Sequence, residues 1–203
     1  MLVPVQLPFS KTIYQTTDGH SITSDSAFLV KTISDRIVRK NIHLLELGSG
    51  NGIISIMLSH YHPVWKITGI EIQKQLVKLS KDNAKKSETS PIFIEADLRS
   101  LTSSHKYDLI ISNPPYFPKD KGKISPIQER AISRHETLCN MLDILECVKR
   151  NLKKDGSAFI LYPQNREYDI DDFAKKVDLK AMEKFVLDSE KNKKKIIVEL
   201  VHA

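Results

Sequence analysis

Short apolar runs alternate with amphipathic stretches along most of this chain. The runs with the length and β-branched content of strands are residues 43–47, 66–71, 91–96, 109–111, 158–162, 185–187 and 196–201. Apolar residues at helical spacing fall between them, in residues 53–58, 73–85, 136–152 and 170–177. Strands that alternate with helices predict an α/β fold with a mostly parallel sheet. The link at 190–195 is too short for a crossover, so the last two strands are expected to form an antiparallel hairpin.

The helical pattern also predicts which side chains face the core. In residues 73–85 the inward side chains are expected to be Leu76, Val77 and Ser80. In residues 136–152 the apolar face consists of Leu138, Met141, Leu142, Leu145, Val148 and Leu152. Asp155 and Gly156 form a turn signal that is expected to end this helix.

One apolar run ends in an unusual polar segment. Residues 109–111 suit a strand buried on both faces, and Asn113 follows them. Pro114 and Pro115 cannot donate to a strand ladder, so the strand must end at Asn113. Open α/β sheets bind ligands at the carboxyl ends of their strands. Asn113 is therefore expected at a ligand site.

The segment Asn113-Pro114-Pro115-Tyr116 offers a specific chemistry. The Asn113 side-chain oxygen and the Pro114 carbonyl can both accept hydrogen bonds from one amino group, and Tyr116 supplies a flat face. An NH₂ group conjugated to a ring or carbonyl is a poor nucleophile because its lone pair is delocalised. Two fixed acceptors would favour a pyramidal nitrogen whose lone pair points at an electrophile. The simpler alternative is a proline-rich turn that only ends the strand.

A glycine-rich loop follows the strand at residues 43–47. Gly48, Gly50 and Gly52 stand at alternate positions ahead of an apolar helix. Glycines let the backbone approach a ligand closely and turn into a helix whose N-terminus carries partial positive charge. The spacing differs from Gly-x-Gly-x-x-Gly, which argues against a pyrophosphate cofactor. A ligand that bears a carboxylate fits as well.

Two acidic residues are expected at the same edge of the sheet. Glu71 ends the strand at residues 66–71 and is placed to accept both hydroxyls of a ribose. Asp97 follows the strand at residues 91–96 and could accept from an adenine amino group. The alternatives are a solvent-facing acid at a strand end for Glu71 and a turn or helix-cap aspartate for Asp97.

Two further segments have less regular patterns. Residues 23–25 precede an apolar stretch and predict an entry helix capped by Ser24 or Asp25. Residues 118–132 show neither a helical nor a strand period in their apolar residues, and this basic segment is predicted to form a lid beside the site. With Arg134, the candidate RNA-binding residues of this region are Lys119, Lys121, Lys123, Arg130 and Arg134. A solvated surface loop is the alternative.

Composition sets broad limits. A chain of 203 residues with 40% hydrophobic content can bury a full core, and a single domain over residues 1–203 is expected. The net charge of +6 is a moderate bias toward polyanionic partners. No apolar run approaches the length of a membrane span and the start lacks a signal peptide, so a cytoplasmic monomer without membrane contact is expected.

The two cysteines are not expected to form a disulfide or a metal site. Cys139 and Cys147 fall on one predicted helix, about 12 Å apart along its axis. That separation exceeds the reach of a disulfide. No Cys or His stands at ligand spacing from either of them, so a buried apolar role is expected for both and no metal is expected.

Taken together, the glycine loop, Glu71, Asp97 and the Asn113 segment resemble class I S-adenosylmethionine-dependent methyltransferases. Within that group, Asn-Pro-Pro-Tyr resembles enzymes that methylate planar NH₂ groups. Residues 23–29, 47–54, 69–73 and 131–136 resemble the family that methylates N6 of the adenine 3′ to the anticodon of a valine tRNA. The role of the Arg134-His135-Glu136 segment stays open.

The resemblance implies a Rossmann-like seven-stranded methyltransferase sheet, S-adenosylmethionine as cofactor and tRNA as substrate. Asn113, Pro114, Pro115 and Tyr116 would hold the target amine. The residues that it places at the cofactor are Asp25, Glu46, Gly48, Gly50, Gly52, Glu71, Ile72, Asp97, Leu98 and Asn113.

Three other functions remain open at this point. The same tetrapeptide serves enzymes that methylate a glutamine amide of a release factor or ribosomal protein, although those usually carry an N-terminal helical domain. Methylation of a base amine in rRNA or DNA is a second alternative. A catalytically silent protein that only binds RNA is a third, and the intact Asn113, Tyr116, Glu71 and Asp97 argue against it.

Overall fold

The strands of the main sheet confirm the predicted α/β architecture. The computed structural model describes residues 1–17, 24–114, 139–187 and 194–203. Its seven-stranded sheet has the order β5-β4-β3-β6-β7-β9-β8. The bounds are β3 His43–Leu47, β4 Lys66–Glu71, β5 Ile92–Glu95, β6 Tyr107–Ser112, β7 Leu152–Pro163, β8 Leu179–Leu187 and β9 Lys195–His202. All neighbours are parallel except that β9 runs antiparallel to both β7 and β8, so the predicted hairpin is confirmed.

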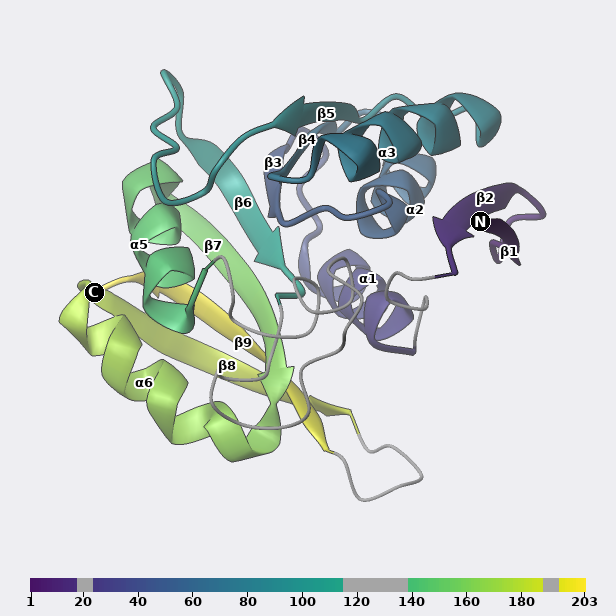
Figure 1. Ribbon diagram of the computed structural model, residues 1–203. Helices are drawn as coiled ribbons and strands as arrows, with labels where there is room; N and C mark the ends of the chain where they lie inside the picture. Colours follow the sequence, from purple (N-terminus) through teal and green to yellow (C-terminus); the bar gives the residue numbers. More distant parts are fainter. Residues whose placement is uncertain (18–23, 115–138, 188–193) are drawn as a thin grey trace.

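Helices cover both faces of this sheet (Figure 1). One side carries α1 Ser24–Arg36, α2 Ile53–Tyr61 and α3 Lys74–Lys86, and the other carries α5 Met141–Asn151 and α6 Glu167–Lys176. The central strands are apolar on both faces because both are covered: Leu44, Leu45, Leu109, Ile110 and Phe159 are almost fully buried. Leu76, Val77 and Ser80 of α3 are also buried, as the pattern predicted. None of the helices in the described ranges has the length and apolar content needed to cross a bilayer.

The N-terminal segment holds a small sheet that the sequence did not predict. Strands β1 Leu2–Gln6 and β2 Thr12–Thr16 form an antiparallel pair apart from the main sheet. The buried amide of Asn83 in α3 fastens β2 to the domain. Its Oδ1 accepts from the Tyr14 N–H at 2.8 Å and its Nδ2 donates to the Tyr14 carbonyl at 2.9 Å. The hairpin is therefore attached to α3 by hydrogen bonds between two residues that are 69 positions apart in the sequence.

The predicted end of the helix in residues 136–152 was wrong. Asn140 forms a capping box with Asp143, so α5 begins at Met141, and Cys139 lies before it rather than on it. The helix ends at Asn151, and Asp155 and Gly156 lie within β7. A Cβ at position 156 would stand 2.9 Å from the Asp108 carbonyl, so this glycine permits the close approach of β6 rather than a helix end.

Candidate functional site

The carboxyl ends of β3, β4 and β6 bring the predicted site segments together. Leu47, which ends β3, lies opposite Ile70 of β4 and Ser112 of β6. The Ser112 hydroxyl donates to the Leu47 carbonyl at 2.9 Å and fixes the two strand ends to each other. The glycine loop, Glu71 and Asn113 therefore leave the sheet at one edge, as expected from the sequence.

Glu71 lies at the end of β4, as expected, and it also fixes the glycine loop. The buried carboxylate accepts the Gly50 N–H through Oε2 at 3.1 Å and the Gln73 N–H through Oε1 at 3.0 Å. A carboxylate can accept about four hydrogen bonds. The two backbone bonds fix its orientation and leave capacity for hydroxyls of a ligand.

The loop backbone has the shape of a ligand cradle. Gly48, Gly50 and Gly52 all have positive φ, at 70°, 55° and 85°. Open space stands where a Cβ would project from Gly48 and Gly50. The buried Ser49 hydroxyl forms no hydrogen bond with any residue in the described ranges. Open backbone and an unpartnered hydroxyl in the same loop fit the S-adenosylmethionine that the sequence resemblance implies.

Glu46 lies beneath this loop and is fully buried. The Ser55 hydroxyl and the Ser55 N–H of α2 both donate to its Oε2, the latter at 3.1 Å. Burial raises the pKa of the Glu46 carboxyl from 4.5 to about 8, against the lowering effect of the Ser55 hydrogen bonds, and the Glu71 charge raises it further. The negative charge of Glu71 beside the loop favours a ligand that carries positive charge, as S-adenosylmethionine does.

The raised pKa predicts a specific pH dependence of stability. The folded chain holds a proton on Glu46 that the unfolded chain loses above pH 4.5, so stability falls as the pH rises from 4.5 to about 8. Glu46→Gln should remove this part of the dependence, which is worth up to about 1.4 kcal/mol per pH unit. Urea unfolding at pH 5, 6, 7 and 8 measures it. If the free energy of unfolding changed with pH in the same way for the wild type and Glu46→Gln, Glu46 would be ionised in the folded chain.

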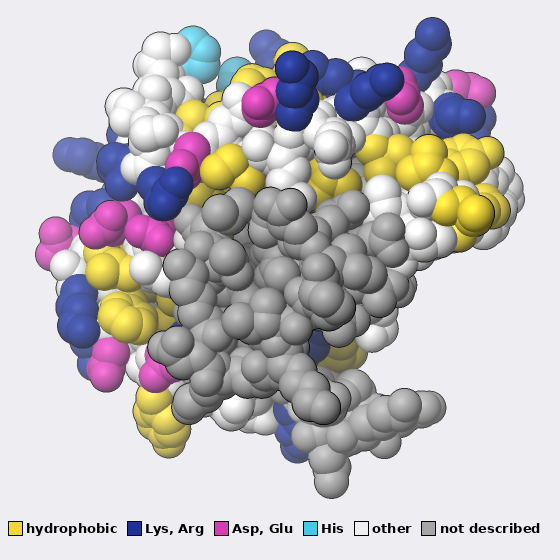
Figure 2. Space-filling view, in the orientation of Figure 1, with side chains coloured by type: hydrophobic (Ala, Val, Ile, Leu, Met, Phe, Trp, Pro, Cys, Tyr) yellow, Lys and Arg dark blue, Asp and Glu magenta, His cyan; other side chains and the backbone are white. Residues whose placement is uncertain are grey.

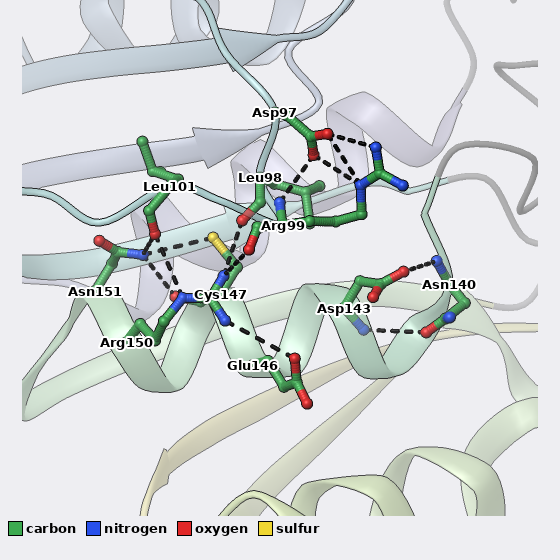
Figure 3. Close-up of polar contacts among 10 residues, drawn as sticks. All are labelled: Asp97, Leu98, Arg99, Leu101, Asn140, Asp143, Glu146, Cys147, Arg150 and Asn151. Atoms are coloured by element: carbon green, nitrogen blue, oxygen red, sulfur yellow. Dashed lines mark hydrogen bonds and ion pairs between the residues drawn. The ribbon is translucent and has the colours of Figure 1, made fainter.

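Asp97 lies at the same edge, two residues beyond β5 (Figure 3). The Ala96 N–H donates to the Glu71 carbonyl at 3.1 Å and extends the pairing of β4 and β5 up to this segment. Arg99 Nε donates to both carboxylate oxygens of Asp97 at 3.0 Å, and these hydrogen bonds lower the pKa of Asp97. An ionised Asp97 remains an acceptor, but any adenine amino group must share it with Arg99.

The segment that carries Asp97 and Leu98 is held by α5, which lies on the face of the sheet opposite to α1, α2 and α3. Arg150 Nη2 donates to the Leu98 and Arg99 carbonyls at 3.0 and 2.9 Å, and its Nε donates to the Leu101 carbonyl at 3.4 Å (Figure 3). Asn151 Nδ2 also donates to the Leu101 carbonyl, at 3.2 Å. Sequence analysis missed Arg150 and Asn151, because neither the helical pattern nor a motif indicates where their side chains reach.

Arg150 is therefore expected to affect the cofactor site without touching it. Arg150→Met should lower the free energy of unfolding by about 1–3 kcal/mol, since three carbonyls lose a charged donor. It should also weaken S-adenosylmethionine binding several-fold, measured by calorimetric titration. Arg150→Lys is the matched comparison, because it keeps the charge but not the planar fork. If both variants bound the cofactor as tightly as the wild type, the hydrogen bonds of Arg150 would have no effect on the cofactor site.

Asp25 lies in the first turn of α1, and its place at the cofactor stays a prediction. The described part of α1 begins at Ser24, and the expected capping by Ser24 or Asp25 stays a prediction, because the residues before Ser24 lie outside the described ranges. Asp25 is buried and forms an ion pair with Lys195 of β9. The pair links α1 to the C-terminal hairpin.

The remaining predicted residues divide by whether the structure describes them. Asn113 is half-buried directly beyond β6, Pro114 is buried and Ile72 is exposed. Outside the described residues lie Pro115, Tyr116, Lys119, Lys121, Lys123, Arg130 and Arg134, with the Arg134-His135-Glu136 segment.

Burial raises the pKa of the Cys147 thiol to about 11, in keeping with its expected apolar role. Within residues 1–17, 24–114, 139–187 and 194–203, no three His, Cys, Asp or Glu side chains are grouped as metal ligands.

Comparison with known proteins gives consistent matches. A family model described as "Methyltransferase small domain" matches residues 19–185. A tRNA1(Val) (adenine(37)-N6)-methyltransferase of Dyadobacter fermentans is 30% identical over 123 residues, which are 59% of this chain and 50% of that protein. A putative protein N5-glutamine methyltransferase of Methanocaldococcus jannaschii is 40% identical over 99 residues, 49% of this chain and 48% of that protein. The chain spans about half the length of such curated relatives.

A solved structure shows the same fold. The Pyrococcus abyssi tRNA (uracil-54, C5)-methyltransferase in complex with S-adenosyl-L-homocysteine has a TM-score of 0.69 and 15% identity. The match covers 98% of this chain and 44% of that one. It confirms the Rossmann-like sheet expected from the sequence.

Proposed function

The chain belongs to the methyltransferase small domain family, and from this premise we propose that it transfers a methyl group from S-adenosylmethionine to N6 of an adenine in tRNA. The observation that carries the proposal is the position of Asn113 at the end of β6. It adjoins the end of β3, from which the glycine loop begins. A planar amine held by Asn113 would thus lie beside the cofactor loop. The tRNA methyltransferase relative named above supports adenine as the acceptor.

The residues of this chain would act mainly by positioning. S-adenosylmethionine, when bound, supplies a methyl group made electrophilic by a sulfonium sulfur. The loop from Gly48 to Gly52 and the Glu71 carboxylate would hold that cofactor, and Asp97 with Leu98 would contact its base. The Asn113 side-chain oxygen and the Pro114 carbonyl would accept the two hydrogens of the amine and direct its lone pair. The base must leave its stack to reach them, which costs less in a loop than in a duplex.

Methylation of a protein glutamine is the second candidate. The N5-glutamine methyltransferase relative has the higher identity of the two reported, although over a shorter stretch. A glutamine amide presents the same planar NH₂ group as adenine N6, so Asn113 and Pro114 would serve it equally well.

A transfer assay separates the two candidates. The protein is incubated with S-adenosylmethionine labelled on its methyl group and, separately, with tRNA, rRNA, DNA, a release factor and ribosomal proteins. The expected result is label in tRNA, recovered after nuclease digestion as N6-methyladenosine. Label in glutamine of a protein fraction would establish the second candidate. Label in rRNA or DNA alone would mean that this nucleic acid, and not tRNA, is the substrate.

A further inference from the structure

The outward face of α3 carries an unbroken row of lysines. They are Lys74, Lys78, Lys81 and Lys85, spaced four, three and four residues apart and all exposed. At 100° per residue these four side chains fall within one narrow stripe, about 17 Å long at 1.5 Å per residue. We call it the α3 lysine stripe. None of its members forms an ion pair with a residue that the structure describes.

Exposed opposite charges three or four residues apart form ion pairs elsewhere in the chain: Lys31 with Asp35, Glu146 with Arg150 and Arg166 with Asp169. In α3 the exposed Asp82 stands four residues after Lys78 and three before Lys85, but it forms an ion pair with neither. Ion pairs at this spacing stabilise a helix slightly, and like charges at the same spacing destabilise it. The α3 lysine stripe thus contains three successive repulsive neighbours. Lys74 also stands in the first turn, where the helix dipole disfavours a cation.

The position of the stripe connects it to the candidate site. Lys74 comes three residues after Glu71, so the stripe begins at the carboxyl edge of the sheet and runs away from it. Figure 2 shows Lys and Arg side chains along the upper rim of the molecule, over α3 as seen in Figure 1. At the far end Lys86 stands 4.6 Å from the ring centroid of Tyr14 in β2, which adds a further cation beside the row.

The face fits an extended polyanion rather than a membrane. A membrane-bound amphipathic helix turns its apolar side to the lipid. The apolar side of α3, with Leu76, Val77 and Leu79, is buried within the protein, and its exposed residues are all polar or charged, most of them lysines. A row of cations without apolar residues matches the evenly spaced charges of a phosphate backbone.

We propose that the α3 lysine stripe binds the phosphate backbone of the RNA substrate and guides it toward Asn113. The inference rests on the proposed function, because it supposes that the substrate is RNA. It adds a binding surface on α3, in addition to the basic segment of residues 118–132 that the sequence indicated.

The test compares two variants with the same net charge. In the first, the four lysines of the stripe are changed to glutamine (Lys74→Gln, Lys78→Gln, Lys81→Gln and Lys85→Gln). In the control, four exposed lysines near the amino ends of the strands are changed: Lys40→Gln, Lys66→Gln, Lys154→Gln and Lys180→Gln. Dissociation constants for unmodified tRNA are measured by fluorescence anisotropy between 50 and 200 mM salt, and S-adenosylmethionine binding by calorimetry.

The stripe variant is expected to bind tRNA on the order of tenfold to hundredfold more weakly than the wild type, with cofactor affinity unchanged. The slope of log Kd against log salt should fall by about 3, since each lost phosphate contact contributes roughly 0.7–0.9. The control variant should change little. Equal losses in both variants, or none in the stripe variant, would overturn the proposal, and so would a wild type that binds no tRNA. Tight, stripe-dependent tRNA binding without methyl transfer to tRNA would instead contradict the proposed function alone.

Discussion

Replacing Asn113 by alanine is expected to lower turnover on the order of 10²–10³-fold while S-adenosylmethionine binds nearly as tightly as before. Asn113 follows the last residue of β6 and is half-buried at the edge where the glycine loop begins. Its amide oxygen would accept from the amine of the substrate, a bond that strengthens as the nitrogen becomes pyramidal. Loss of an interaction made mainly in the transition state lowers kcat rather than affinity.

Single-turnover methylation with saturating tRNA and cofactor measures this effect. Asn113→Asp is a useful comparison, because it keeps an acceptor oxygen and should retain more activity than Asn113→Ala. If Asn113→Ala lost cofactor affinity in proportion to its rate, Asn113 would be a structural strand cap and the proposed mechanism would be wrong.

Gly52→Ala is expected to have the largest effect on stability among single changes in the glycine loop. Position 52 has φ +85°, and a Cβ there would stand 2.7 Å from Phe93 of β5 and 2.9 Å from the Ser80 Cβ of α3. The left-handed backbone costs an alanine about 1–2 kcal/mol and overpacking adds about 1–3 kcal/mol. The free energy of unfolding should therefore fall by about 2–5 kcal/mol.

Gly50→Ala provides the matched control for Gly52→Ala. It has φ +55° but open space at the Cβ position, so only the backbone cost of about 1–2 kcal/mol applies. Urea unfolding measures both variants, and calorimetric titration shows whether an added methyl group at Gly50 reaches the cofactor instead. Equal destabilisation by the two substitutions would mean that Phe93 and Ser80 move aside and that the crowding at position 52 is without effect.

The segments that carry the site were predictable because their signals are local. Prolines at 114 and 115 end a strand through their own geometry, and alternate glycines after residues 43–47 indicate a turn into a helix. Once the strands were assigned as parallel, Glu71 and Asn113 had to leave the sheet at the same edge. The family and fold that these residues indicated are confirmed.

The sequence by itself thus determined the α/β class, the sheet edge at which the candidate site residues meet and the chemistry that is proposed for Asn113. Only the tertiary structure decided which distant groups support that edge. Burial raises the pKa of Glu46, Phe93 crowds Gly52, and Arg150 reaches across to the carbonyls beside Asp97. These contacts join residues that are far apart in the chain, so no local period or spacing encodes them. They arise when helices and strands, each stabilised by its own pattern, pack and bring side chains within hydrogen-bonding or van der Waals distance.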